Sequence, residues 1–154
     1  RKPITVTDPT MTRFMMTLQE SVDLVLHAFS HGEQGDLFVQ RAPACTVLDL
    51  AKALSGINSG SAEIRVIGAR HGEKRAESLI SREEVAKSVD MGSYVRIPLD
   101  IRDLNYASVE ADYDLETNLA EDYTSDNTTQ LSIEDIQSLV FDAGLLEVPD
   151  LQAN

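Results

Sequence analysis

The sequence lacks several features that mark particular classes of protein. Only one of its 154 residues is a cysteine, Cys45, so no disulfide can form within the chain, which fits a reducing cytoplasm. The apolar residues around Cys45 predict a buried side chain rather than a nucleophile. No apolar run approaches the length of a membrane span, and the N-terminus does not resemble a signal peptide. We therefore expect a cytoplasmic protein without a membrane partner.

Positive charge is missing from the last third of the chain. Residues 1–102 hold all 13 Lys and Arg and 13 of the 26 Asp and Glu, so the other 13 acidic residues lie in residues 103–154. That segment accounts for the whole net charge of −13 and would repel a polyanion, so nucleic acid is not expected as a partner. It is either a solvated surface or a docking surface for a basic patch.

The motifs of several catalytic centres are also absent. No glycine-rich phosphate loop occurs, no tyrosine is followed by lysine in the Tyr-x-x-x-Lys spacing, and no G-x-S-x-G elbow is present. His27 and His31 are four residues apart, but no third ligand is evident, so we expect no metal site. We expect no catalytic residue in this chain.

The apolar pattern predicts strands alternating with helices. Extended segments are expected at residues 3–9, 36–40, 63–67 and 93–98. Helices are expected after the capping signals at Thr17, Thr46 and Ser81 and again from Ser132 to Gly144. Residues 107–128 show no clear period and are acidic, which predicts either an extended arm or a partly disordered segment. This order predicts an α/β fold, with too few strands for a full doubly wound sheet, which suggests the end of a longer chain.

Anion-binding chemistry is concentrated in "ARHGEKRAE", residues 69–77, together with Arg13. The guanidinium groups of Arg13 and Arg70 offer planar donor forks that match phosphate oxygens. Glu73 offers an acceptor for the vicinal hydroxyls of a ribose, and Gly72 lets a backbone approach a ligand closely. The ordinary alternative is a solvated loop whose ion pairs contribute little.

Five segments carry a resemblance to a known family: "PITVTDPTMTRFMMT", "ARHGEKRAESLIS", "GDLFVQRAPACTVLDLAKAL", "YVRIPLDIRDLNY" and "EDYTSDNTTQLS". Together they cover most of the chain. They resemble the C-terminal part of the UDP-N-acetylglucosamine 4,6-dehydratase/5-epimerases of capsule and O-antigen polysaccharide biosynthesis. These enzymes are extended short-chain dehydrogenases/reductases.

The resemblance implies an α/β substrate-binding part with a small β-sheet and helices at residues 1–104, and an acidic C-terminal extension with a terminal helix at residues 105–154. The NAD(P) loop and the catalytic Tyr-x-x-x-Lys would lie in the full-length enzyme, upstream of this chain. Its chemistry would be oxidation at C4, loss of water across C5 and C6, and hydride return at C6. A homo-oligomer is expected.

The resemblance also implies roles for particular residues in binding a UDP-sugar. Arg13 and Arg70 match arginines that contact the diphosphate, and Glu73 matches the acidic residue that faces the uridine ribose. Other residues of the same motifs are also expected to line the substrate-binding site: Thr12, His71, Gly72 and Lys74. The resemblance assigns no individual role to His71 or Lys74. The family pattern is broken at Arg75–Ala76 and at Val95, which leaves the sugar open. The rival hypothesis is a non-catalytic acidic domain that binds a basic protein partner.

Overall fold

Short strands in several small sheets, rather than one large sheet, organise the chain. The computed structural model describes residues 2–57, 62–99 and 120–145. The elements of its first part are β1 (Ile4–Val6), β2 (Thr12–Phe14), α1 (Leu18–His31), β3 (Leu37–Gln40), β4 (Ala44–Thr46) and α2 (Val47–Ile57). They are followed by β5 (Ile64–Val66), β6 (Ser78–Ile80), α3 (Arg82–Val85), β7 (Val89–Asp90), β8 (Tyr94–Ile97), β9 (Tyr123–Thr124) and α5 (Ile133–Asp142). The predicted α/β class, with small sheets and helices, is confirmed.

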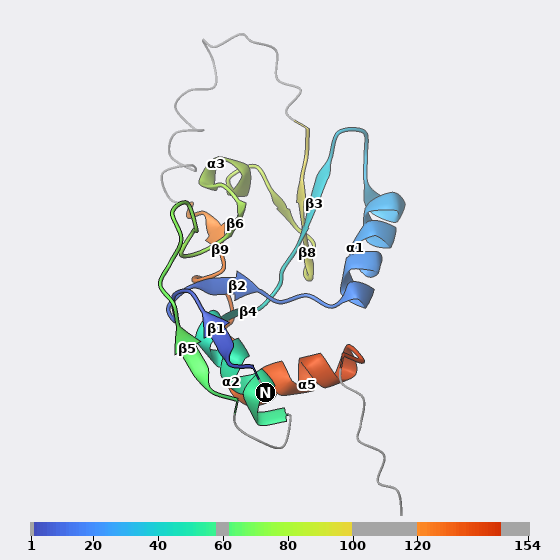
Figure 1. Cartoon of the computed structure of the whole chain (residues 1–154). Helices are drawn as coiled ribbons and strands as arrows, with labels where there is room; N and C mark the ends of the chain where they lie inside the picture. Colours follow the sequence, from blue (N-terminus) through green and yellow to red (C-terminus); the bar gives the residue numbers. More distant parts are fainter. Residues whose placement is uncertain (1, 58–61, 100–119, 146–154) are drawn as a thin grey trace, which may run out of the picture.

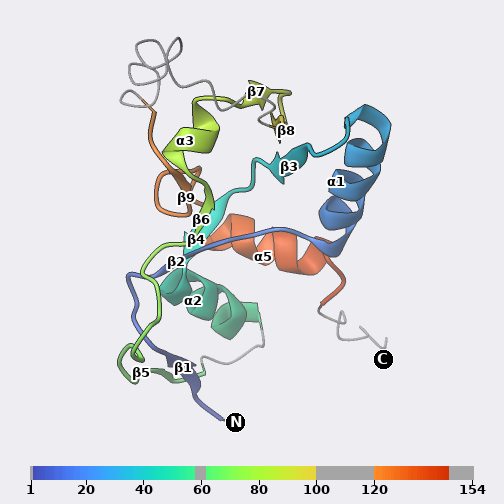
Figure 2. The same ribbon diagram turned by 90° about the horizontal axis from the view of Figure 1, so that it is seen from above.

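The sheets join segments that are far apart in the sequence (Figures 1 and 2). β1 pairs with β5 in parallel, and β2 pairs with β4 in antiparallel orientation. β3, β8 and β7 form a three-stranded sheet, and β6 pairs with β9 near the C-terminal end of the described chain. β2 carries Arg13 and is held by β4, whereas β6 follows residues 69–77 and is held by β9. These pairings position the residues of the candidate site.

Reciprocal capping boxes begin three helices. The Thr17 hydroxyl accepts a hydrogen bond from the Glu20 backbone N–H at 3.2 Å, and the Glu20 carboxylate accepts from the Thr17 backbone N–H at 2.7 Å. The same exchange begins α3 at Ser81 and α5 at Ser132. The helix starts predicted at these residues are confirmed, because a capping box needs only residues within one turn.

Two apolar clusters form the interior. In the first, α2 and α5 pack through Ala53 and Ile136, both 0% exposed, beside the buried Cys45. Burial and the nearby Asp49 carboxylate raise the pKa of the Cys45 thiol, so this residue is an inert core side chain. The second cluster centres on Ile80, with β8 packed against it. The burial predicted for Cys45 is confirmed.

The structure differs from the sequence-based prediction in its strands. β2, β4, β6, β7 and β9 were not predicted, and "MTRFMM" in particular was interpreted as a connector. Each of these strands has only two or three residues, too few to show an alternating pattern. The predicted boundary at 104/105 and residues 107–119 of the predicted arm lie outside the described residues, whereas part of the remainder forms β9. No helix among the described residues is long and apolar enough to cross a membrane.

Candidate functional site

Arg13 lies in the middle of β2, where its backbone pairs with Cys45 of β4. Thr12, which precedes it, is 7% exposed, and its backbone N–H donates to the carbonyl of Arg75 at 2.9 Å. β2 therefore lies beside the C-terminal end of the predicted anion-binding motif, although more than sixty residues separate the two in the sequence.

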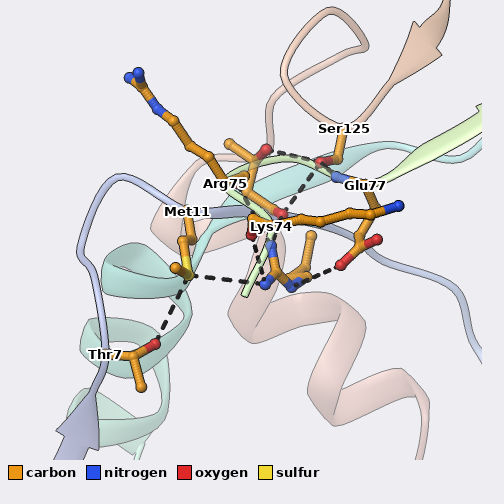
Figure 3. Close-up of polar contacts among 8 residues, drawn as sticks. Thr7, Met11, Lys74, Arg75, Glu77 and Ser125 are labelled. Atoms are coloured by element: carbon orange, nitrogen blue, oxygen red, sulfur yellow. Dashed lines mark hydrogen bonds and ion pairs between the residues drawn. The ribbon is translucent and has the colours of Figure 1, made fainter. Parts of the chain in front are cut away.

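The Arg13 guanidinium binds this neighbouring segment through several donors. Its Nη1 donates to the Thr12 carbonyl at 2.6 Å, and its Nη2 donates to the Lys74 carbonyl at 3.1 Å. Its Nε lies 3.6 Å from a carboxylate oxygen of Glu77, and its Nη2 also donates to the sulfur of Met11 at 3.7 Å; Figure 3 labels both of these partners. Most of the donors of Arg13 are therefore used within the protein, where they hold residues 74–77 against β2.

Ser125 joins both segments from the C-terminal side. It is 0% exposed, and its hydroxyl lies 2.7 Å from the Thr12 hydroxyl and 3.1 Å from the Thr12 carbonyl oxygen. The Ser125 hydroxyl oxygen also accepts a hydrogen bond from the Glu77 backbone N–H at 2.9 Å, and the Ser125 backbone N–H donates to the Glu77 carbonyl at 2.8 Å (Figure 3). Ser125, Thr12 and Glu77 form the Ser125 junction.

A tight turn at residues 70–73 presents the other predicted site residues. The Glu73 backbone N–H donates to the Arg70 carbonyl at 3.2 Å, and the Glu73 carboxylate accepts from the Arg70 backbone N–H at 3.1 Å. Gly72 has φ of 89°, a conformation that favours glycine, and an added Cβ there would meet nothing within 4 Å. The turn geometry therefore explains the glycine and leaves open space beside it.

Cationic side chains surround this turn without being buried. Arg70, His71, Lys74 and Arg75 are all exposed, and Figure 3 shows the Arg75 side chain extending away from the contacts of the Ser125 junction. Within the described part of the chain, no hydrogen bond or ion pair involves the Arg70 guanidinium. This group therefore keeps its donors available for an anion.

The structure does not join the two predicted arginines directly. Among residues 2–57, 62–99 and 120–145, no hydrogen bond or ion pair links the Arg13 side chain to Arg70 or to Glu73. The Arg13 side chain contacts the backbone carbonyl of Lys74, the residue after Glu73. The structure thus brings Arg13 to the end of the motif, while Arg70 and Glu73 lie in the exposed turn.

Matches to family models cover almost the whole chain. A model described as "Polysaccharide biosynthesis protein" matches residues 1–99, and one described as "Polysaccharide biosynthesis protein C-terminal" matches residues 100–147. The chain belongs to the polysaccharide biosynthesis protein family. This confirms the broad family expectation that the quoted segments raised.

The proteins that match this chain are considerably longer than it is. Proteins named UDP-glucose 4-epimerase from Rickettsia bellii and Rickettsia rickettsii are each 55% identical to it over 139 residues. Those residues are 90% of this chain but 41% of each relative, so the chain spans less than half of their length. The X-ray structure of Pen from Bacillus thuringiensis matches 95% of this chain and 42% of its own, with 26% identity and a TM-score of 0.76.

Among the residues that the structure describes in this polysaccharide biosynthesis protein, no group of three or more His, Cys, Asp or Glu side chains could hold a metal ion. α2 follows directly from β4, and Thr46 and Val47 stand at the junction.

Two residues of the site, Ser125 and Glu77, were not predicted from the sequence. Ser125 lies in "DYTSDNT", a segment that carried the family resemblance without indicating any role. A buried serine bonded across 113 residues has no local signature. Only its presence in a motif matching the family could have drawn attention to it.

Proposed function

We propose that this chain is the UDP-sugar-binding part of a nucleotide-sugar epimerase or dehydratase. The observation that supports this most strongly is the 55% identity to proteins named UDP-glucose 4-epimerase. The Arg70–Glu73 turn adds a physical reason, because it presents an unpaired guanidinium beside a carboxylate whose other oxygen has no partner among the described residues. These two groups complement a diphosphate and a ribose.

In this proposal Arg70 binds the diphosphate. Its side chain is exposed at the turn, and a planar fork of donors matches two phosphate oxygens at once. Lys74 lies next to Glu73 in the sequence, is also exposed, and adds positive potential over the same turn. His71 is the residue after Arg70 and is exposed as well. Binding energy at the nucleotide would orient the attached hexose for chemistry elsewhere in the enzyme.

Glu73 has a double role in this proposal. One carboxylate oxygen accepts from the Arg70 N–H and closes the turn. The other accepts hydrogen bonds from the vicinal hydroxyls of the ribose. Ribose binding and turn closure therefore depend on the same side chain.

We assign Arg13 a positioning role rather than a direct contact with phosphate. Its guanidinium holds the Lys74 carbonyl at 3.1 Å and lies 3.6 Å from Glu77, so it fixes the segment on which the turn stands. Loss of Arg13 would then weaken binding by releasing that segment. Thr12 acts with it through its contact to Ser125.

The finer proposal is that the sugar is UDP-N-acetylglucosamine and that the whole enzyme is a 4,6-dehydratase/5-epimerase of capsule or O-antigen synthesis. It is supported by the matched polysaccharide biosynthesis models and by the quoted motifs. NAD(P) would be held by other residues of a longer polypeptide, so we assign it no step in this chain. A cytoplasmic homo-oligomer completes the proposal.

Titration calorimetry of the 154-residue chain with UDP, UDP-glucose and UDP-N-acetylglucosamine tests the proposal. Arg70→Ala removes a charge-assisted bond worth about 1.5–3 kcal/mol, so the Kd should rise roughly tenfold or more. Arg41→Ala is the matched control, because Arg41 is also exposed and pairs with Asp90 on another sheet. A chain that binds none of the three ligands, or an Arg70→Ala variant with wild-type affinity, contradicts the proposal.

A further inference from the structure

A hollow of about 180 Å³ opens among α3, β6, β8 and the segment that contains β9. Figures 1 and 2 both show α3, β6 and β9 next to one another. The hollow has an apolar floor and an acidic rim, and it is separate from the turn at residues 70–73. We call it the β9 hollow and define it by six of its lining residues: Ile80, Val85, Val95, Glu121, Asp122 and Tyr123.

The floor of the β9 hollow is part of the second apolar cluster. Ile80 is 2% exposed and Val95 is 3% exposed, and Val85 and Tyr123 pack against them. Apolar groups at the bottom of a hollow favour an occupant with an apolar body, because its contact with them removes both surfaces from water. The floor therefore selects for hydrocarbon.

The walls of the β9 hollow are held by the fold. The Tyr123 hydroxyl donates to the Ala42 carbonyl at 2.9 Å, and the Tyr123 ring lies 5.4 Å from the Phe14 ring between centroids. Val95 lies on the central strand of its sheet, where it pairs with Val39 on one side and with Asp90 on the other. The hollow is therefore formed before any ligand enters, as is usual for binding sites.

Negative charge on the rim is only partly balanced. Arg41 also lines the hollow, but its Nη2 donates to the Asp90 carboxylate at 2.9 Å. The Oδ1 of Asp122 accepts from the Arg82 backbone N–H at 2.8 Å and from its Nε at 3.4 Å. Among the described residues, neither the Oδ2 of Asp122 nor the carboxylate of the exposed Glu121 has a partner. Carboxylate acceptors therefore remain available above the apolar floor.

Size and charge together narrow the class of occupant. Pockets that enclose drug-sized ligands have volumes of about 300–1,000 Å³, so this smaller hollow suits a single side chain. A basic side chain buries its aliphatic stem and keeps its charged end at the surface. Lysine fits better than arginine, because its compact ammonium has three rotatable donors for two separate carboxylates, whereas a guanidinium is a rigid planar fork.

The charge of the chain favours a foreign occupant. Residues 103–120, which lead into Glu121, contain no Lys or Arg. A second copy of the chain carries the same net charge of −13 and would be repelled at long range. A polypeptide of opposite charge would be attracted to the same rim.

We propose that the β9 hollow binds a lysine side chain of a separate, basic polypeptide. The stem of that lysine contacts Ile80 and Val95, and its ammonium binds the carboxylates of Glu121 and Asp122. The site goes beyond the proposed UDP-sugar binding and uses none of the residues assigned to it. Either proposal can therefore fail without the other.

NMR spectroscopy of the isotopically labelled 154-residue chain tests this site. The probes are acetyl-Ala-Ala-Lys-Ala-Ala-amide and the same peptide with norleucine, which keeps the apolar stem and lacks the charge. At about 20 mM salt, where screening is weak, the lysine peptide should shift the methyl signals of Ile80 and Val95. It should also bind at least about threefold more tightly than the norleucine peptide.

Three variants separate the contributions of charge and shape. Glu121→Gln should weaken binding of the lysine peptide by about two- to fivefold and leave the norleucine peptide unchanged. Glu63→Gln is the matched control, because it makes the same charge change at an exposed carboxylate that pairs with Arg65. Val95→Phe places a ring in the hollow and should weaken both peptides, with the Ile80 methyl signals as the readout. The dispersion of the amide spectrum reports whether each variant is folded.

Several outcomes would overturn the proposal. They are the absence of methyl shifts with the lysine peptide, equal affinity for the two peptides, and equal effects of Glu121→Gln and Glu63→Gln. If Val95→Phe does not fold, the comparison of Glu121→Gln with Glu63→Gln decides alone. Shifts of the same methyl signals on concentrating the chain without peptide would show that a second copy occupies the hollow, and would also overturn the proposal.

Discussion

Replacing Ser125 by alanine tests whether the Ser125 junction fixes the site. A serine hydroxyl offers one donor and two acceptor positions, and all three are used here. Ser125 donates to the Thr12 carbonyl at 3.1 Å, while the Thr12 hydroxyl at 2.7 Å and the Glu77 N–H at 2.9 Å donate to it. Ser125→Ala therefore removes one donor and leaves two donors without their acceptor.

The expected loss follows from the burial of these two donors. Each buried polar group left without a hydrogen-bond partner costs about 1–3 kcal/mol. The Glu77 N–H belongs to a half-buried residue and can bind water instead, so its cost lies at the low end of that range. Ser125→Ala should therefore lower the unfolding free energy by about 2–4 kcal/mol. Adding Thr12→Val removes one of the stranded donors. The double variant should therefore be more stable than the sum of the single losses, by about 0.5–3 kcal/mol.

Urea unfolding followed by far-ultraviolet circular dichroism measures these free energies. Ser30→Ala is the control, because Ser30 is exposed and bonds only its own helix, at the Leu26 carbonyl. That control should stay within about 0.5 kcal/mol of the wild-type protein. A Ser125→Ala variant as stable as the control, or strict additivity with Thr12→Val, would refute the assigned bonds.

Two further predictions concern the helices. Ser132→Ala removes the cap of α5 and should cost about 1 kcal/mol in the same unfolding assay, whereas Ser132→Asn should retain most of the stability; equal losses would argue against the capping box with Asp135. Burial, followed by the nearby His31, lowers the pKa of His27 below 6.5 in the folded chain, so stability should fall as the pH drops through 6.5 toward that lower value. His27→Phe should reduce this acid-dependent loss in urea unfolding above and below pH 6.5, and an unchanged pH dependence in that variant would contradict the assignment.

Local signals in the sequence predicted the helix starts well. Thr17, Ser81 and Ser132 each sit three residues before an acidic side chain, and the capping box they form lies within a single turn. Gly72 was singled out only as a residue that lets a backbone approach a ligand closely, and its φ of 89° in the turn is a property of that one residue. Such features depend on neighbours in the sequence, which a reader of the sequence can see.

The pairing of the short strands could not be predicted from the sequence, because it joins residues that are far apart in the chain. β2 pairs with β4 across residues that share no pattern, and the backbone of Arg13 opposes Cys45. The sequence grouped Arg13 with residues 69–77 as one anion-binding set, which stays a prediction for Arg70 and Glu73. It did not show that the Arg13 guanidinium is occupied by the Lys74 carbonyl, because a contact across 61 residues depends on the whole arrangement of the chain.

The apolar face of α1 shows a different limit. The periodicity of Val25 and Phe29 predicts an apolar face on α1, but it carries no information about which surface will cover that face. In the structure Phe29 is 85% exposed.

The bond between Thr12 and Ser125 has a consequence for biosynthesis. During translation, residues 70–77 leave the ribosome long before the serine that secures them, which is 113 residues beyond Thr12. A nascent chain stalled before that serine would carry the turn at residues 70–73 without the bonds that hold Glu77 to Ser125. The arrangement of this segment is thereby coupled to synthesis of the residues around Ser125.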